Sequence, residues 1–260
     1  MPATLVGLIV ALLMVMVGAQ THHVSPVFLV SNVTALLIVI GGGLGATIAS
    51  FEFTATTGVF KAIMRAVLGK DRPIDSGETI RTLVDFARKS RAEGLLALES
   101  EMANLEDPFM KRGLQLAIDG SDPDAGAQVM RTDIKAMKAR HKVGSDWCQA
   151  YGIFAPTFGI IGAVIGLVAT LAELDKPEKL GAGIAGAFVA TFLGVFMANG
   201  VMLPLSNRMK RLSAQEVQAR EMVMEGVLSI QGGQNPRVIE ETMMSYLSPS
   251  EAEALREASA

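Results

Sequence analysis

Three residues able to bend a helix or to contact a small cation lie inside two long apolar stretches. Pro156 lies within residues 152–174, and Thr191 and Pro204 lie within residues 180–205. A proline inside a helix removes a backbone donor and clashes with the preceding turn, so it creates a bend or hinge and leaves a carbonyl available. A static kink is the alternative interpretation of each proline. The pattern indicates helix packing or an ion path rather than bond-making chemistry.

The cores of the apolar stretches in this chain contain no Asp, Glu, Lys, Arg or His. Their polar groups, such as Thr170, Thr191 and Asn199, are neutral hydroxyls and amides. A path for protons or sodium ions normally needs an ionisable or polar ligand at membrane depth, where such groups are costly and functional. If the protein conducts protons, the titrating carboxylate must therefore come from a second protein.

Small residues recur at four-residue spacing in both stretches. Gly162 and Gly166 share one side of the first stretch, and Gly186, Ala190 and Gly194 share one side of the second. Small side chains at this spacing let the backbones of membrane helices approach closely. The pattern is typical of generic membrane packing, and it also suits a ring of subunits around a central helix.

These two stretches are part of a set of four that could cross a membrane. Half of the 260 residues are apolar and the mean hydropathy is +0.38, as in membrane proteins. The other two runs are residues 3–19 and 27–50, and no Lys or Arg precedes the first, which disfavours a cleaved signal peptide. No strand pattern occurs. We predict an all-α polytopic membrane protein with four transmembrane helices and a helical cytoplasmic domain.

The basic residues predict the topology of the chain. Fifteen of the 23 lysines and arginines lie within residues 51–150, and six follow Leu205. By the positive-inside rule both regions are cytoplasmic, so both termini are expected on the cytoplasmic side. Trp147 and Tyr151 then fall at the cytoplasmic mouth of the third span, where an aromatic belt is expected.

Patterning divides the chain into four expected segments and several helices. The segments are residues 1–50 with peripheral spans 1 and 2, 51–150 as a cytoplasmic helical domain, 151–205 with channel-lining spans 3 and 4, and 206–260 as cytoplasmic helices and tail. Within them we expect a helix from about residue 75 that Gly94 interrupts, and helices over 109–118, from 125 into the third span, over 206–230 and over 237–247. The last dozen residues are expected to be disordered.

Composition excludes several classes of function. Residues 51–150 hold 15 acidic and 15 basic side chains and the net charge is –3, which disfavours nucleic-acid binding. The lone Cys148 cannot form an internal disulfide, and nothing near His141 completes a metal site. No metalloprotease helix motif and no Gly-x-Ser-x-Gly elbow occurs. We therefore expect neither an enzyme nor a metal or cofactor site.

Charged residues gather around one short segment of the central region. Arg88, Lys89 and Arg91 precede Glu93 and Glu99. Such a group is ordinarily the solvated face of a helix, although its balanced charge also suits contact with a protein partner.

The segment Arg91–Glu99, with sequence RAEGLLALE, resembles the cytoplasmic signature of the MotA/PomA flagellar stator subunits, which belong to the MotA/TolQ/ExbB superfamily. Further stretches are similar to the same family in the same order: 113–120, Arg140-His141, the span with Pro156, 187–194, and the tail motif 225–241. The similarity covers about residues 27–247, and the combination is far more specific than any single piece.

The resemblance implies an assembly and a mechanism. A pentameric ring of this subunit would surround two copies of a single-span B subunit that is anchored to peptidoglycan and supplies a membrane aspartate. Ion passage would turn the ring in the bacterial inner membrane and drive the flagellar rotor. Pro156 and Pro204 match the prolines that couple ion flow to movement.

The resemblance also implies a rotor contact. Arg91 and Glu99 match the charged pair that engages the rotor's switch protein. Ala92 stands where many relatives have a second basic residue, so Arg88 or Lys89 is expected to share the contact.

The transported ion follows from a comparison of two positions. Sodium-driven relatives pair a threonine on the third span with one on the fourth, whereas this chain keeps Thr191 and has Ala163 at the other position. Fewer oxygens are then available to replace sodium's hydration shell, so we predict proton drive and no cofactor.

Two alternatives stay open. One is an ExbB/TolQ-type energiser of outer-membrane processes, whose three spans and different tail disfavour it. The other is a structural membrane scaffold, which does not explain the prolines.

Overall fold

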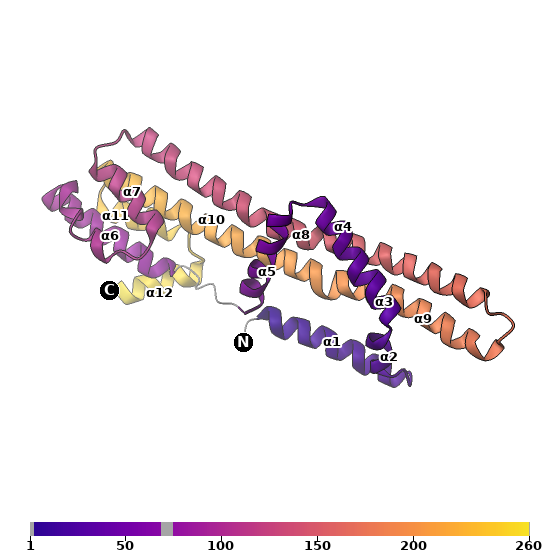
Figure 1. The fold of residues 1–260 in the computed structure, drawn as a ribbon. Coiled ribbons are helices and arrows are strands. Elements are labelled where there is room, and N and C mark those ends of the chain that lie inside the picture. Colours follow the sequence, from indigo (N-terminus) through magenta and orange to yellow (C-terminus); the bar gives the residue numbers. More distant parts are fainter. Residues whose placement is uncertain (1–2, 69–74, 260) are drawn as a thin grey trace. The chain divides into compact units, whose positions relative to one another are not determined.

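The computed structural model describes residues 3–68 and 75–259, and every regular element in those ranges is helical, which confirms the all-α prediction. The expected segments also contain residues 1–2, 69–74 and 260, which lie outside the described residues. The elements in chain order are α1 (Ala3–Thr21), α2 (Pro26–Ser31), α3 (Val33–Leu36), the π-helix η1 (Leu37–Gly42), α4 (Gly43–Ser50), α5 (Phe53–Leu68), α6 (Ser76–Glu93), the 3₁₀ turns η2 (Leu95–Leu98) and η3 (Met102–Asn104), α7 (Pro108–Ile118), α8 (Pro123–Leu171), α9 (Pro177–Phe196), the π-helix η4 (Met197–Met202), α10 (Leu203–Gln231), α11 (Pro236–Met244) and α12 (Pro249–Ser259) (Figure 1).

The chain divides into two compact units. Unit 1 comprises residues 1–71 and 141–212, and unit 2 comprises residues 72–140 and 213–260. The helices α8 and α10 each run across the boundary. The division does not follow the expected segment border at residue 51, because α5 buries Val59 and Ala66 in the core of unit 1.

Within residues 3–68 and 75–259, four stretches are long and apolar enough to cross a membrane, as expected, so the chain is a multi-pass membrane protein. The second of them begins at Val33 rather than at residue 27. Asn32 leaves the helical conformation there, and its side-chain oxygen accepts the N–H of Ala35 at 3.0 Å as a new N-cap. Its amide nitrogen reaches the carbonyl of Gly186 on α9 at 3.5 Å. The asparagine therefore splits the expected run into α2 and a separate span.

In unit 1, α3 and η1 pack on α9, and α1 contacts α5 and η4. The helix α1 is apolar all round and has no buried residue. A helix of this kind is stable only against lipid or other membrane helices. Most side chains of α1 are therefore available to lipid or to a further chain.

The aromatic pair at the start of the third span is internal rather than interfacial. Trp147 and Tyr151 are each 1% exposed and stack at 6.1 Å between ring centroids. The indole N–H donates to the Thr56 hydroxyl at 3.3 Å. Residues of an aromatic belt face the headgroups, so the expected belt role does not describe these side chains. Packing within unit 1 accounts for the difference, because α5 contacts Trp147 and α4 lies against the ring of Tyr151 at Gly43.

Unit 2 encloses its own core between α6, α7, α11, α12 and the parts of α8 and α10 that it contains. The helices begin at side-chain caps: Asp75 accepts two backbone N–H groups of α6, and Asp107 accepts that of Phe109 in α7. Gly94, with φ +87°, ends α6 as the sequence predicts.

Residues 249–259 are ordered, which corrects the expectation of disorder at this end of the chain. They form α12, whose Leu255 is buried in the core of unit 2. The carboxylate of Glu251 accepts hydrogen bonds from the backbone and the hydroxyl of Ser248. Ser-x-x-Glu is a capping box, so the signal for this helix is present in the sequence.

Candidate functional site

The backbones of α8 and α9 touch at Pro156. A Cβ placed on Gly194 would lie 2.5 Å from the carbonyl oxygen of Ala155 and 3.1 Å from the Cα of Pro156. A Cβ on Gly159 would lie 2.9 Å from the carbonyl oxygen of Ala190. No side chain fits at either glycine unless one helix moves. The two glycines therefore allow the backbones of α8 and α9 to approach this closely.

The remaining small residues extend the same contact. A Cβ on Gly162 would lie 3.0 Å from the Cβ of Ala190, and one on Gly166 would lie 3.3 Å from that of Ala187. The small-residue faces of spans 3 and 4 therefore pack against each other within one chain. Large apolar side chains such as Ile160, Val164 and Val168 are exposed on α8 instead.

Thr191 and Ala163 lie on the two helices of this crossing. A Cβ on Gly159 would lie 3.2 Å from the Cα of Thr191, and Ala163 is one helical turn further along α8. Both residues are half-buried. The crossing thus brings Pro156 and Thr191 together around Gly159.

Pro204 is accompanied by a change of helix type that the sequence interpretation did not include. The preceding residues 197–202 form the π-helix η4, in which the N–H of Leu203 donates to the carbonyl of Ala198 five residues back. A proline has no N–H and its ring collides with the carbonyl four residues earlier, so a widened turn relieves the collision. The Asn199 amide donates to the carbonyl of Val195 at 3.1 Å at the entry to this turn.

The surroundings of the two prolines are connected. A Cβ on Gly152, one turn before Pro156, would lie 2.9 Å from a methyl carbon of Leu203, the residue before Pro204. Only Pro204 changes the helix type, because α8 continues as an α-helix from Pro123 through Pro156 to Leu171. The residue before Pro204 therefore packs against the turn of α8 that precedes Pro156.

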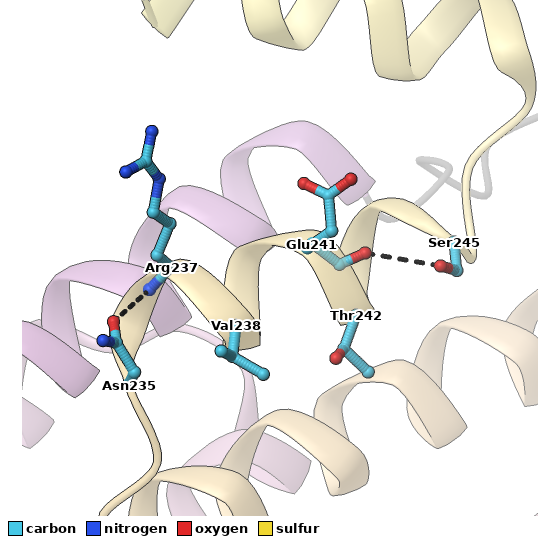
Figure 2. A pocket seen from close by; sticks show the side chains of 6 residues that line it. All are labelled: Asn235, Arg237, Val238, Glu241, Thr242 and Ser245. Carbon is cyan, nitrogen blue, oxygen red and sulfur yellow. Dashed lines mark hydrogen bonds between the residues drawn. The ribbon is translucent and has the colours of Figure 1, made fainter.

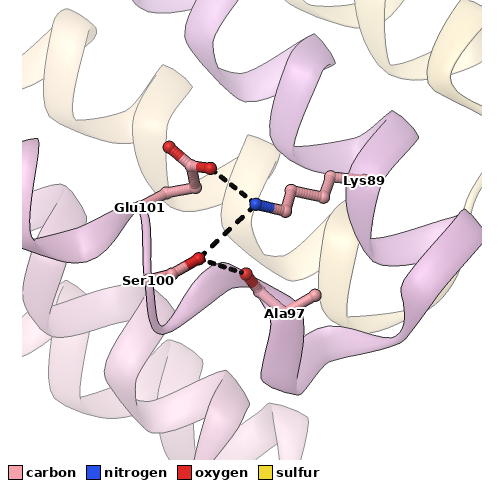
Figure 3. A network of polar contacts seen from close by, with 4 residues as sticks. All are labelled: Lys89, Ala97, Ser100 and Glu101. Carbon is pink, nitrogen blue, oxygen red and sulfur yellow. Dashed lines mark hydrogen bonds and ion pairs between the residues drawn. The ribbon is translucent and has the colours of Figure 1, made fainter.

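The four charged residues predicted for the rotor contact differ in their partners. Arg88 pairs with Asp85 at 3.2 Å, and Lys89 pairs with Glu101 at 2.5 Å (Figure 3). Arg91 and Glu99 are exposed, and within residues 3–68 and 75–259 no hydrogen bond or ion pair joins their side chains to another side chain. These two are therefore free to meet another protein.

A shallow hollow of about 560 Å³ lies over α11 and is lined by Asn235, Arg237, Val238, Glu241, Thr242 and Ser245 (Figure 2). Two of its polar side chains bond locally, since the Asn235 side chain accepts the backbone N–H of Arg237 and the Ser245 hydroxyl donates to the carbonyl of Glu241. In the described part of the chain, no three His, Cys, Asp or Glu side chains come together to hold a metal ion.

Fold and site together define a polytopic helical membrane protein whose third and fourth spans form a close, proline-containing pair. Residues 101–222 match the model of the MotA/TolQ/ExbB proton channel family. The chain is 38% identical over 244 residues to "Motility protein A" of Bacillus subtilis (94% of this chain, 90% of that one). It is 35% identical over 246 residues to "Chemotaxis protein PomA" of Vibrio alginolyticus (94% of each).

Two solved structures share the fold. The flagellar MotAB stator complex of Bacillus subtilis matches with a TM-score of 0.89 at 37% identity, covering 96% of this chain and 97% of that one. The C. jejuni MotAB structure matches with a TM-score of 0.90 at 28% identity (95% and 96%). The chain belongs to the motility protein A family of flagellar stator subunits, which favours this function over the ExbB-type alternative.

Proposed function

We propose that this stator subunit conducts protons with the help of a carboxylate from a B subunit. One observation carries the proposal: the cores of spans at residues 3–19, 33–50, 152–171 and 180–205 contain no ionisable side chain. Intramembrane ionisable groups mark ion pathways, so the titrating group belongs to another chain. The B subunit is a single-span protein anchored to peptidoglycan, it supplies a membrane aspartate, and two copies lie inside a pentameric ring.

The proposed coupling runs through the crossing at Pro156. One charge that crosses about 150 mV releases about 3 kcal/mol. This is similar to the energy of one charge-assisted hydrogen bond, so each proton can drive one small rearrangement. The contact of Gly152 with Leu203 and the π-turn before Pro204 support a rearrangement that moves α8 and α10 together.

The proposed output is torque on the rotor's switch protein. Arg91 and Glu99 make this contact, because both are exposed and neither forms an ion pair with another residue of the described part of the chain. The subunit lies in the bacterial inner membrane with both termini in the cytoplasm, since basic residues gather in the central and C-terminal regions.

Proton drive rests on Ala163. Ala163 has no hydroxyl to pair with that of Thr191, so fewer oxygens are available there to replace the hydration shell of a sodium ion. Cells that depend on this subunit should swim in sodium-free medium and stop when an uncoupler collapses the proton gradient. Swimming that needs sodium and survives the uncoupler would refute proton drive.

Purification from the native membrane in mild detergent tests the assembly. Mass spectrometry should find a single-span protein with a membrane Asp and a peptidoglycan-binding domain. A TolR-like partner would move the chain to the transport energisers, and recovery of the chain alone as a stable oligomer would favour a scaffold.

A further inference from the structure

The turn between α6 and η3 presents one leucine to solvent and buries its neighbours. Gly94, with φ +87°, reverses the chain after α6. Leu98 is fully buried in the core of unit 2 and Leu95 packs against that core. Leu96 between them is 72% exposed. Two anchored leucines therefore fix a short 3₁₀ turn with the third pointing outward.

This exposure is unusual within unit 2. Among the large apolar side chains described there, only Leu96 and Val238 are exposed, Val238 at 54%. A single exposed leucine is common on protein surfaces and by itself indicates nothing. Leu96, however, lies between Arg91 and Glu99 in the sequence, two exposed charged side chains for which no ion pair occurs within residues 3–68 and 75–259. Protein contacts often combine an apolar anchor with a charged rim.

Lys89, Ser100 and Glu101 form a polar cluster, here called the clasp, that joins the turn to α6. The Lys89 ammonium on α6 donates to Glu101 at 2.5 Å and to the Ser100 hydroxyl at 3.5 Å, and Ser100 donates to the carbonyl of Ala97 at 3.1 Å (Figure 3). The hydrogen bond to Glu101 raises the pKa of Lys89. The clasp ties the end of η2 to α6, so Lys89 is occupied inside the subunit rather than offered to a partner.

We propose that Arg91, Leu96 and Glu99 form one contact surface with Leu96 as its apolar centre, and that the Lys89–Glu101 clasp holds its shape. The inference rests on the proposed rotor contact and names the chemistry of its partner. The switch protein would present an apolar depression that receives Leu96, with a carboxylate beside Arg91 and a cation beside Glu99. Lys89 is then a positioning residue, in contrast to the expectation that it shares the contact.

The test replaces Leu96 by alanine in the full chain, expressed with its B subunit in a motile strain that lacks the native copy. The residence time of fluorescent subunits at single motors is measured, together with ion conduction. Leu96→Ala should shorten the residence time about ten-fold and leave conduction unchanged. Val238→Ala is the matched control and should change neither. An unchanged residence time in Leu96→Ala, or an equal loss in Val238→Ala, would overturn the apolar centre.

A charge exchange tests the clasp. Lys89→Glu should shorten the residence time, and the double variant Lys89→Glu with Glu101→Lys should restore it to within about two-fold of wild type. If the double variant stays as impaired as the single one, Lys89 contacts the partner directly and the clasp is refuted. If the wild-type chain never joined motors, the proposed function itself would be refuted. That outcome differs from the two results that would refute the contact surface or the clasp.

Discussion

Replacing Gly194 by alanine tests how closely α8 and α9 approach at Pro156. The new Cβ would lie 2.5 Å from the carbonyl oxygen of Ala155. Carbon and carbonyl oxygen atoms normally stay about 3.3 Å apart even in close contacts, so the helices must separate by roughly 0.8 Å. Overpacking of this kind costs about 1–3 kcal/mol. Alanine also has a higher helix propensity than glycine, which offsets up to about 1 kcal/mol of this destabilisation.

Gly181→Ala on the same helix is the matched control, since nothing lies within 4 Å of its Cβ position. Gly181→Ala therefore gains the higher helix propensity of alanine, but its new Cβ meets no neighbouring atom. The assay is thermal unfolding of the purified subunit in detergent, followed by the fluorescence of Trp147, the single tryptophan of the chain. Gly194→Ala should unfold several degrees below the control and impair swimming. Equal midpoints for the two variants would refute the close backbone contact.

Three further predictions concern other parts of the chain. Thr56→Val leaves the buried indole N–H without its acceptor and should cost about 1–3 kcal/mol in thermal unfolding, whereas Thr57→Val, on an exposed residue, should have little effect. Pro204→Ala restores a backbone N–H and should increase hydrogen-exchange protection of the preceding π-turn while swimming slows; unchanged exchange would show that the proline does not maintain this turn. Hydrogen bonds from Ser248 lower the pKa of Glu251 in the folded protein, so their stabilisation is present above the unfolded pKa near 4.5 and lost as pH falls through the folded value. The difference in the exchange protection of α12 between wild type and Ser248→Ala should therefore be clear at pH 7 and shrink below pH 4.5.

Local signals in the sequence predicted much of the fold. Pro108 after Asp107 starts α7, and Gly94 ends α6, because caps and breakers act within a few residues. The same logic applies to Ser248 and Glu251, whose capping box starts α12. That helix escaped prediction because the composition of the last residues suggested disorder.

Contacts between distant segments escaped prediction for a different reason. Trp147 reads as an interfacial residue by its position, yet α5 covers it and Thr56 accepts its N–H. The sequence pattern places Lys89 in a solvated group of charges, whereas the structure pairs it with Glu101. The chain reaches Glu101 through a turn that requires a positive φ at Gly94. Periodicity describes one segment at a time and cannot choose between partners.

The sequence by itself determined that the chain spans a membrane, roughly where it does so, and that the cores of these spans hold no ionisable side chain. Hydropathy and the absence of charge are properties of the residues whatever their neighbours are. Tertiary structure decided that the small faces of α8 and α9 meet each other, that Pro204 is paired with a π-turn, and that Leu96 points outward. These features depend on fractions of an ångström between helices, and only the packed chain sets those distances.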